Sequence, residues 1–109
     1  MKEAIHLGSR REVAPDKIER LESKGNYTLI HLTDGSDFLS SITLGTLQKR
    51  LSSFRFFRVN RSTLINLDYL GRFTIHSQSG ILLETKKRNT QDIFLSRRRE
   101  PAFIAYINA

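Results

Sequence analysis

Apolar residues recur along this chain in short alternating runs separated by turn residues, a pattern typical of antiparallel β-structure. The pair Asp34-Gly35 lies between two such runs and predicts a tight hairpin in which both residues have positive φ. A second hairpin is predicted around residues 78–80. Strands are expected at residues 4–8, 18–23, 27–33, 38–42, 54–60, 71–77, 81–86 and 92–95, with a further apolar stretch at 64–70.

A mid-chain segment changes from this alternation to helical spacing. Leu44, Leu47 and Leu51 fall at positions i, i+3 and i+7, which places them on one face of a helix. Thr43 precedes them and is the candidate N-cap residue, whereas Gly45 weakens the helix. We therefore expect one short helix between the strands.

The end of the chain also has helical spacing. Phe103, Tyr106 and Ile107 predict one apolar face of a helix over residues 100–107. Pro101 suits the first turn of that helix, because the first turn needs no N–H donor there. The predicted fold class is thus mostly β, with small antiparallel sheets and hairpins, one short mid-chain helix and a C-terminal helix.

The length and composition of the chain favour one small folded domain. With 109 residues it is too short for two ordinary domains, so we expect a single domain over residues 1–109 without a receiver or sensor domain. The hydrophobic fraction of 39% supports a folded globule. The chain has no Cys, no apolar run long enough to cross a membrane and no signal-peptide pattern. A cytoplasmic protein without disulfides is the resulting expectation.

The net charge of +7 is concentrated in the second half of the chain. Residues 1–48 carry a balance of −1, whereas residues 49–109 carry +8. Such an uneven basic surface favours a polyanionic partner, and nucleic acid is the commonest one. Charge that serves solubility alone, or attraction to an anionic membrane surface, remains an alternative at this point.

No constellation of residues in the sequence predicts an enzyme. His6, His31 and His76 lie in three separate predicted strands without metal-ligand spacing, and no Cys accompanies them. The sequence also has no Gly-rich loop of the kind that cradles phosphates. We expect no catalytic residues, no metal, no cofactor and no small-molecule substrate.

Three strings of residues follow one another along the chain: residues 20–27 (RLESKGNY), residues 56–66 (FFRVNRSTLIN) and residues 95–98 (LSRR), the last just before the terminal helix. Taken in this order, they resemble the LytTR DNA-binding domain of bacterial transcriptional regulators. The resemblance implies small antiparallel sheets and a sequence-specific double-stranded DNA-binding domain, the output domain of a two-component response regulator. It further implies that loops at one edge enter two successive major grooves and contact the minor groove between them.

The resemblance also implies roles for individual residues. Asn26 is the expected base reader of the first major-groove loop, and Arg97 that of the second. Asn60 and Arg61 are the expected base-reading residues of the middle element, which would face the minor groove. Phosphate contacts are expected from Lys24, Arg58, Ser62, Ser96, Arg98, Arg99, Lys86 and Lys87.

The chemistry of the two major-groove readers agrees with these roles and leaves alternatives open. The planar guanidinium of Arg97 can donate two hydrogen bonds to one guanine. The run of three Arg from Arg97 onward could instead be only a solvated basic segment. Asn26 could be a turn residue beside Gly25, since Asn is tolerated in the left-handed region.

Alternation along the middle element predicts which of its side chains face outward. In an extended strand, Arg58 and Asn60 share a face opposite Phe57 and Val59. Phe57 and Val59 are therefore core candidates, and Arg61 belongs to the following turn.

Two other classes of protein are compatible with the sequence. A module for RNA or single-stranded nucleic acid would use Tyr27, Phe54 or Phe56 as stacking platforms, although Phe54 and Phe56 are also core candidates. A basic protein-interaction domain would bind an acidic partner instead. For the DNA-binding domain, the resemblance implies repeated half-sites in the DNA, a dimer or paired monomers on them, and fusion to a receiver or sensor domain.

Overall fold

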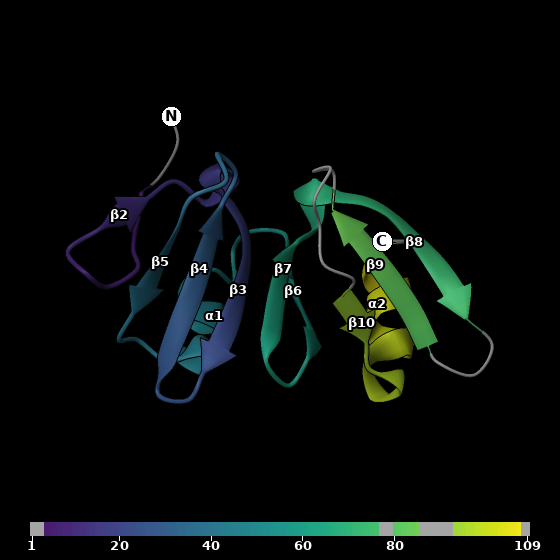
Figure 1. Ribbon diagram of the computed structural model, residues 1–109. Coiled ribbons are helices and arrows are strands. Elements are labelled where there is room, and N and C mark those ends of the chain that lie inside the picture. Colours follow the sequence, from purple (N-terminus) through teal and green to yellow (C-terminus); the bar gives the residue numbers. More distant parts are fainter. Residues whose placement is uncertain (1–3, 77–79, 86–92, 108–109) are drawn as a thin grey trace.

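The structure is a computed structural model that describes residues 4–76, 80–85 and 93–107. Its described part consists mainly of antiparallel strands, with a short helix in mid-chain and another at the end. Two sheets lie side by side, and a small strand pair flanks the larger one (Figure 1). The predicted mostly β fold class is confirmed.

The larger sheet has the strand order β5-β4-β3-β7-β6, with every neighbouring pair antiparallel. The strands from β3 to β5 and the pair β6 and β7 form local hairpins, whereas β3 pairs with β7 from much later in the chain. This non-local pairing joins the two halves of the sheet. The bounds are β3 (Ile18–Lys24), β4 (Tyr27–Leu32), β5 (Asp37–Ser40), β6 (Phe56–Asn60) and β7 (Thr63–Asn66), with α1 (Leu44–Arg50) between β5 and β6.

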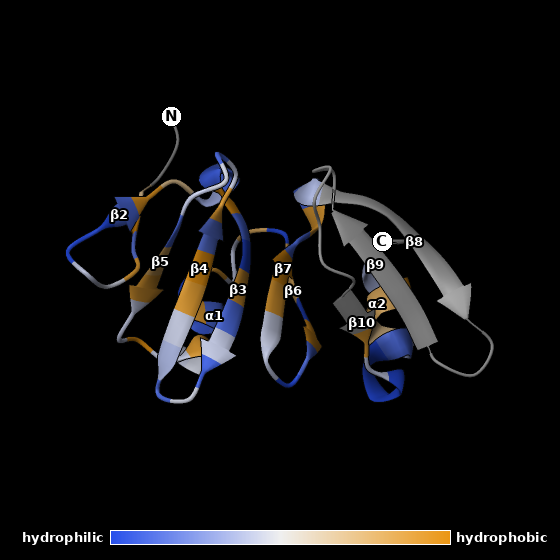
Figure 2. Cartoon of the chain, viewed as in Figure 1, coloured by the Kyte–Doolittle hydropathy of each residue, from blue (hydrophilic) through white to orange (hydrophobic). Residues whose placement is uncertain are grey.

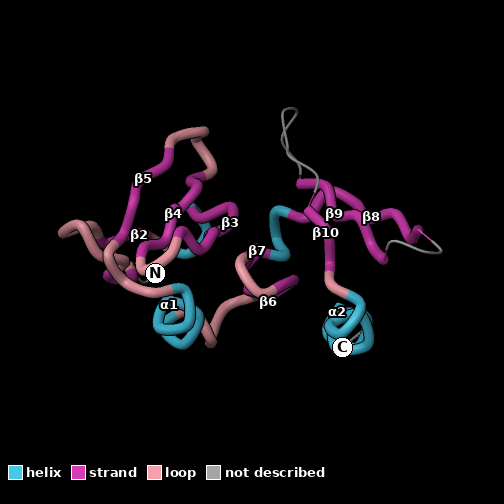
Figure 3. The backbone as a smooth tube through the Cα atoms, turned by 60° about the horizontal axis from the view of Figure 1, so that its bottom comes forward, coloured by secondary structure: helices cyan, strands magenta, loops and turns pink. Residues whose placement is uncertain are grey.

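The smaller sheet has the order β10-β9-β8, and the chain leaves it through a 3-10 turn into the terminal helix. The predicted hairpin of β8 and β9 is confirmed, and its turn lies outside the described residues. Figure 3 shows α1 and α2 on the same side of the two sheets. The remaining bounds are β1 (Ile5–His6), β2 (Glu12–Val13), η1 (Pro15–Lys17), η2 (Leu67–Tyr69), β8 (Leu70–His76), β9 (Gly80–Thr85), β10 (Ile93–Leu95), η3 (Arg97–Arg99) and α2 (Glu100–Ile107).

Two hydrophobic clusters form the core, and β7 contributes to both. Leu64 joins the cluster between the larger sheet and α1, whereas its neighbour Ile65 joins the cluster under β6, β10 and α2. Successive strand residues point to opposite faces, so one strand can contribute side chains to two hydrophobic clusters. Apolar residues follow β3, β4 and β7 through the larger sheet (Figure 2). The fully buried side chains include Leu21, Ile30 and Leu47 in the first cluster and Val59, Leu95 and Phe103 in the second.

The hairpin between β4 and β5 differs from the prediction in one respect. Gly35 has φ +95°, but Asp34 is not among the residues with positive φ. The Asp34 carboxylate instead accepts hydrogen bonds from the backbone N–H of Ser36, at 2.8 Å, and from its hydroxyl. The carboxylate stabilises the turn from the side chain, so only one residue needs the left-handed conformation.

Two expectations about the helices are corrected. Thr43 occupies the N-cap position of α1, but its hydroxyl donates to the Thr46 hydroxyl at 3.1 Å and caps no backbone N–H. In α2, Phe103 is fully buried as predicted, whereas Tyr106 is 39% exposed. The Tyr106 ring still contacts the half-buried Phe57, with ring centroids 5.6 Å apart. The predicted apolar face of α2 is therefore only partly covered.

The apolar stretch at 64–70 is not one element, because a buried polar residue ends β7. The Asn66 side-chain amide donates to the carbonyl oxygen of Ile18 at 2.9 Å, and its oxygen accepts from the backbone N–H of Asp68 at 3.0 Å. These bonds satisfy the buried amide and start the 3-10 turn η2.

Candidate nucleic-acid interface

Three connections predicted to contact DNA lie along one edge of the molecule. They are the β3–β4 turn, the β6–β7 turn and the entrance to α2, all at the bottom of the view in Figure 1. The same three connections are mostly hydrophilic (Figure 2). Segments far apart in the sequence therefore form a single polar edge.

Two main-chain hydrogen bonds tie these three connections together. The N–H of Ser23, at the end of β3, donates to the carbonyl oxygen of Ser62 in the β6–β7 turn at 2.8 Å. The N–H of Ser96, before η3, donates to the carbonyl oxygen of Val59 in β6 at 2.9 Å. The hairpin of β6 and β7 is thus the middle member of the row and is bonded to both of its neighbours.

The β3–β4 turn presents Lys24 and Asn26 to solvent, and both residues are exposed. Gly25 has φ +66°, but Asn26 does not have positive φ. The conformation of the turn therefore does not explain an Asn at this position, which weakens the alternative that Asn26 is only a left-handed turn residue. Lys24 Nζ lies 3.5 Å from Glu22 Oε2, an exposed contact that solvent screens.

The β6–β7 turn is shaped by a bulge in β6. Arg58 pairs with Leu64 and Asn60 with Thr63, so the partner strand has no residue opposite Val59. Val59 is fully buried and Phe57 packs in the same cluster, which confirms both as core residues. The Asn60 side-chain oxygen accepts from the N–H and the hydroxyl of Ser62 at 2.9 and 3.2 Å.

Arg61 and Arg58 differ in their surroundings. Arg61 is exposed in the turn. Arg58 is half-buried, and its guanidinium donates to Gln48 Oε1 at 2.9 Å, to the Asn60 carbonyl at 3.2 Å and to the Arg61 carbonyl. Partial burial, and next the charge of Arg99, lower the pKa of Arg58 below its ordinary value. The phosphate contact expected of Arg58 remains a prediction, beside an internal role that the sequence did not indicate.

The entrance to α2 carries three consecutive arginines in η3. Arg97 and Arg98 are exposed, while Arg99 is half-buried with Nη1 3.5 Å from the Arg58 carbonyl oxygen. Ser96 precedes them in extended conformation, and its hydroxyl caps no backbone N–H. Lys86 and Lys87, two further predicted phosphate contacts, lie outside the described residues.

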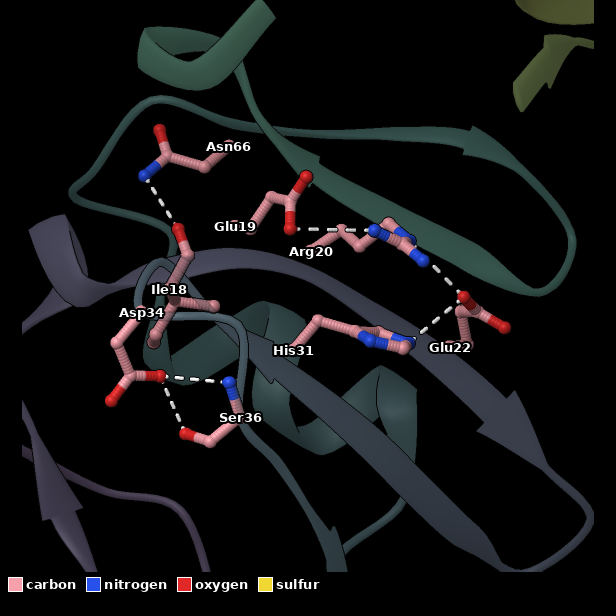
Figure 4. A network of polar contacts seen from close by, with 8 residues as sticks. All are labelled: Ile18, Glu19, Arg20, Glu22, His31, Asp34, Ser36 and Asn66. Carbon is pink, nitrogen blue, oxygen red and sulfur yellow. Dashed lines mark hydrogen bonds and ion pairs between the residues drawn. The ribbon is translucent and has the colours of Figure 1, made fainter. Parts of the chain in front are cut away.

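A polar network that the sequence analysis missed reaches the β3–β4 turn from the sheet (Figure 4). Glu22 Oε1 lies 3.1 Å from Arg20 Nε and 3.0 Å from His31 Nε2, while Arg20 Nη1 lies 3.4 Å from Glu19 Oε2. Glu19 is only 5% exposed. The register of β3 against β4, which places Arg20 opposite His31, brings these side chains together. Through Glu22, the network continues to Lys24.

The network shifts the pKa values of two of its members. Burial alone would raise the pKa of Glu22, but His31, Arg20 and Lys24 together lower it below its ordinary 4.5. Burial, followed by repulsion from Arg20, lowers the pKa of His31 below its ordinary 6.5, against the opposing attraction of Glu22 and Asp37. The structure therefore favours an ionised Glu22 and a neutral His31.

The aromatic residues considered for base stacking occupy different environments. Phe54 and Phe56 are partly buried against the first core cluster, so they serve the fold. Tyr27, next to Asn26, is 49% exposed. Of the three stacking candidates, Tyr27 is the one with a large exposed surface.

Within residues 4–76, 80–85 and 93–107, no group of three His, Cys, Asp or Glu side chains is arranged to hold a metal ion. The same residues contain no helix that is both long enough and apolar enough to span a membrane.

Comparison with known proteins identifies the family. The LytTr DNA-binding domain family matches residues 9–108, and the chain belongs to this family. A solved structure similar to this chain is the LytTr DNA-binding domain of a protein described as a methyl-accepting/DNA response regulator from Bacillus cereus. The two share 19% sequence identity over 100% of each chain with a TM-score of 0.81, which shows a common fold. No curated protein sequence matches the chain.

Proposed function

We propose that this chain binds double-stranded DNA sequence-specifically, as the output domain of a transcriptional response regulator. The observation that carries the proposal is the row of three connections joined by the hydrogen bonds of Ser23 and Ser96. Each connection exposes a basic residue, namely Lys24, Arg61 and Arg97. Three basic contacts along one edge suit the charged backbone of a duplex.

In this mode of binding, the outer connections enter the major groove and the middle one meets the minor groove. Asn26 and Arg97 read bases, because Asn suits the edge of adenine and Arg that of guanine. Asn60 and Arg61 contact the minor groove between them. Lys24, Ser62, Ser96, Arg98, Arg99, Lys86 and Lys87 hold phosphates.

The proposal includes the assembly and the cellular role of the domain. Two copies bind repeated half-sites as a dimer or as paired monomers, and a receiver or sensor domain controls them in the cytoplasm. The chain itself carries out no catalysis, consistent with its membership of a family of DNA-binding domains.

The decisive experiment selects duplexes from a randomised pool at physiological salt. We expect enrichment of a short motif, and Arg97→Ala should lower the preference for that motif by roughly 1–3 kcal/mol, the value of one bidentate base contact. Circular dichroism must show that the variant is folded. Lys49→Ala, which removes a positive charge from an exposed residue of α1, is the control for the loss of charge. Absence of any enriched motif would refute sequence-specific binding.

A second candidate function, binding of single-stranded nucleic acid, is favoured only by the exposed ring of Tyr27. It requires that the chain binds a single strand more tightly than the matching duplex. Tyr27→Ala should then cost about 1–3 kcal/mol of single-strand affinity. Preference for the duplex would exclude this alternative.

A further inference from the structure

We propose that Arg58 is a positioning residue that locks the β6–β7 turn and thereby fixes the separation of the β3–β4 turn from the entrance to α2. The inference rests on the proposed function, because this separation matters for binding only if both outer connections read DNA. It assigns Arg58 a role inside the protein in place of a phosphate contact.

The guanidinium of Arg58 joins three parts of the chain. Nε donates to the Asn60 carbonyl at 3.2 Å and Nη2 donates to the Arg61 carbonyl, so one side chain holds two successive carbonyls of the turn. Nη1 donates to Gln48 Oε1 at 2.9 Å, which anchors the same group to α1. A planar fork with donors at fixed angles suits this geometry, whereas the single ammonium of Lys cannot span three separated acceptors.

The β6–β7 hairpin, whose turn is held by Arg58, is bonded to both neighbouring connections. The Ser62 carbonyl accepts from the N–H of Ser23, and the Val59 carbonyl accepts from the N–H of Ser96. Val59 and Ser62, whose carbonyls accept these two bonds, flank Asn60 and Arg61, whose carbonyls accept from Arg58. A displacement of the turn would move both outer connections relative to each other.

The environment of Arg58 agrees with an internal role. Its side chain is half-buried, and burial is the largest cause of its lowered pKa, with the charge of Arg99 second. Arg61, only three residues away, is exposed. The chain thus offers two neighbouring arginines of which one points into the protein and the other faces solvent.

The first test compares Arg58→Met with Arg98→Met, a pair that removes the same charge from a half-buried and from an exposed arginine. A positioning role predicts that Arg58→Met reduces the preference for the selected motif over a scrambled duplex by roughly tenfold or more, the effect of losing one hydrogen bond to a charged group. Affinity for the scrambled duplex and its salt dependence should change little. Arg98→Met, at a proposed phosphate contact, should instead lower the slope of log affinity against log salt by about 0.9. A parallel loss of both affinities in Arg58→Met, with the same drop in slope, would overturn the proposal.

Two further variants separate geometry from charge. Arg58→Lys keeps the charge and should fail to restore the preference for the motif, whereas a phosphate contact would tolerate Lys. Gln48→Ala removes the anchor on α1 and should reduce the preference in the same direction. Because both changes act on one network, the double variant Gln48→Ala, Arg58→Met should lose less than the two single losses combined. Rescue by Lys, or simple additivity, would contradict the proposal.

A measurement without DNA tests the inference independently of the proposed function. In Arg58→Met, the amide protons of Ser23 and Ser96 should exchange with solvent at least about tenfold faster than in the unchanged chain, since local opening releases their acceptors. An exchange rate unchanged at both amides would overturn the positioning role even if DNA binding is confirmed. Faster exchange in a chain that enriches no DNA motif would support the positioning role and refute the proposed function.

Discussion

At the scale of single residues, Gly8 combines a left-handed backbone conformation with a close contact to a neighbouring side chain. It has φ +90°, and a Cβ atom there would lie 2.4 Å from Ser40 Oγ. That hydroxyl oxygen accepts from the backbone N–H of Ile42 at 3.0 Å, so it is not free to move away. Gly25 also has positive φ, +66°, but no atom lies within 4 Å of its Cβ position.

Gly8→Ala should therefore lower the free energy of unfolding by more than Gly25→Ala does. We expect a loss of about 1–3 kcal/mol at Gly8, from backbone strain and displacement of Ser40, and about 1 kcal/mol or less at Gly25. Urea denaturation of both variants measures the difference. Equal losses of unfolding free energy in the two variants would mean that the contact with Ser40 does not destabilise Gly8→Ala.

A second prediction concerns the pH dependence of stability. The folded chain disfavours protonation of His31, so between its ordinary pKa of 6.5 and its lower folded pKa the unfolded chain binds more protons. Stability should accordingly fall as the pH decreases through 6.5 and level off below the folded pKa. Glu22 acts in the same direction at lower pH: its ionised form stabilises the fold above 4.5, and this stabilisation is lost as the pH falls through its folded pKa.

His31→Gln should remove the first of these two losses and reduce the second, because His31 contributes to the lowered pKa of Glu22. Urea denaturation between about pH 8 and pH 5 would show a flatter profile for the variant. His6→Gln, which replaces an exposed histidine, is the control for the substitution of His by Gln. A profile that steepens in His31→Gln would contradict the assignment.

The sequence allowed the exposed residues of the interface to be proposed, but not their supporting contacts. Asn26 and Arg97 were proposed from the resemblance to the family, with the hydrogen-bonding chemistry of their side chains in agreement. The inward direction of Arg58 depends on the bulge at Val59 and on the position of Gln48 in α1, neither of which has a local signal. The pairing of Glu22 with His31 likewise depends on strand register.

At the scale of elements, β7 has two roles because its alternate residues enter different cores. Leu64 and Ile65 are both fully buried, one in each cluster. Leu64→Ala and Ile65→Ala should each lower the free energy of unfolding by about 2–5 kcal/mol. Both should keep a single cooperative transition, because β7 couples the two clusters. Thermal denaturation followed by circular dichroism provides the measurement, and a two-step transition in Ile65→Ala would show that the clusters unfold separately.

The elements themselves were largely predictable where their signals are local. Period-two alternation and turn residues indicated the hairpins, and helical spacing indicated α1 and α2. The pairing of β3 with β7 was not predicted, since strands far apart in sequence leave no periodic trace of their partnership. The end of β7 was also missed, because Asn66 is buried by bonds to a distant strand.

At the scale of the whole molecule, the alignment of the three connections depends on two backbone donors. Ser96 has φ −65°, which proline also adopts, but proline would remove its N–H and place ring atoms against the Val59 carbonyl. Ser96→Pro should therefore separate the entrance to α2 from β6, whereas Ser96→Ala keeps the donor and removes only the hydroxyl.

We expect Ser96→Pro to lower the free energy of unfolding by about 1–3 kcal/mol and to weaken binding to the selected motif more than Ser96→Ala does. Titration of labelled duplex with each variant, together with urea denaturation, gives both quantities. If the Pro and Ala variants bind the motif equally, the main-chain bond does not contribute to alignment.

Main-chain atoms form the two bonds between the connections, and this has a consequence for how such a domain can change its target. Side chains at Asn26 and Arg97 can be replaced without removing the donors at Ser23 and Ser96 or their acceptors. In the proposed mode of binding, substitutions at the reading positions would alter the preferred bases while the distance between the two groups of bases stays constant. Variants of this domain should therefore differ in the base sequence of their DNA sites before they differ in the spacing between the two groups of bases.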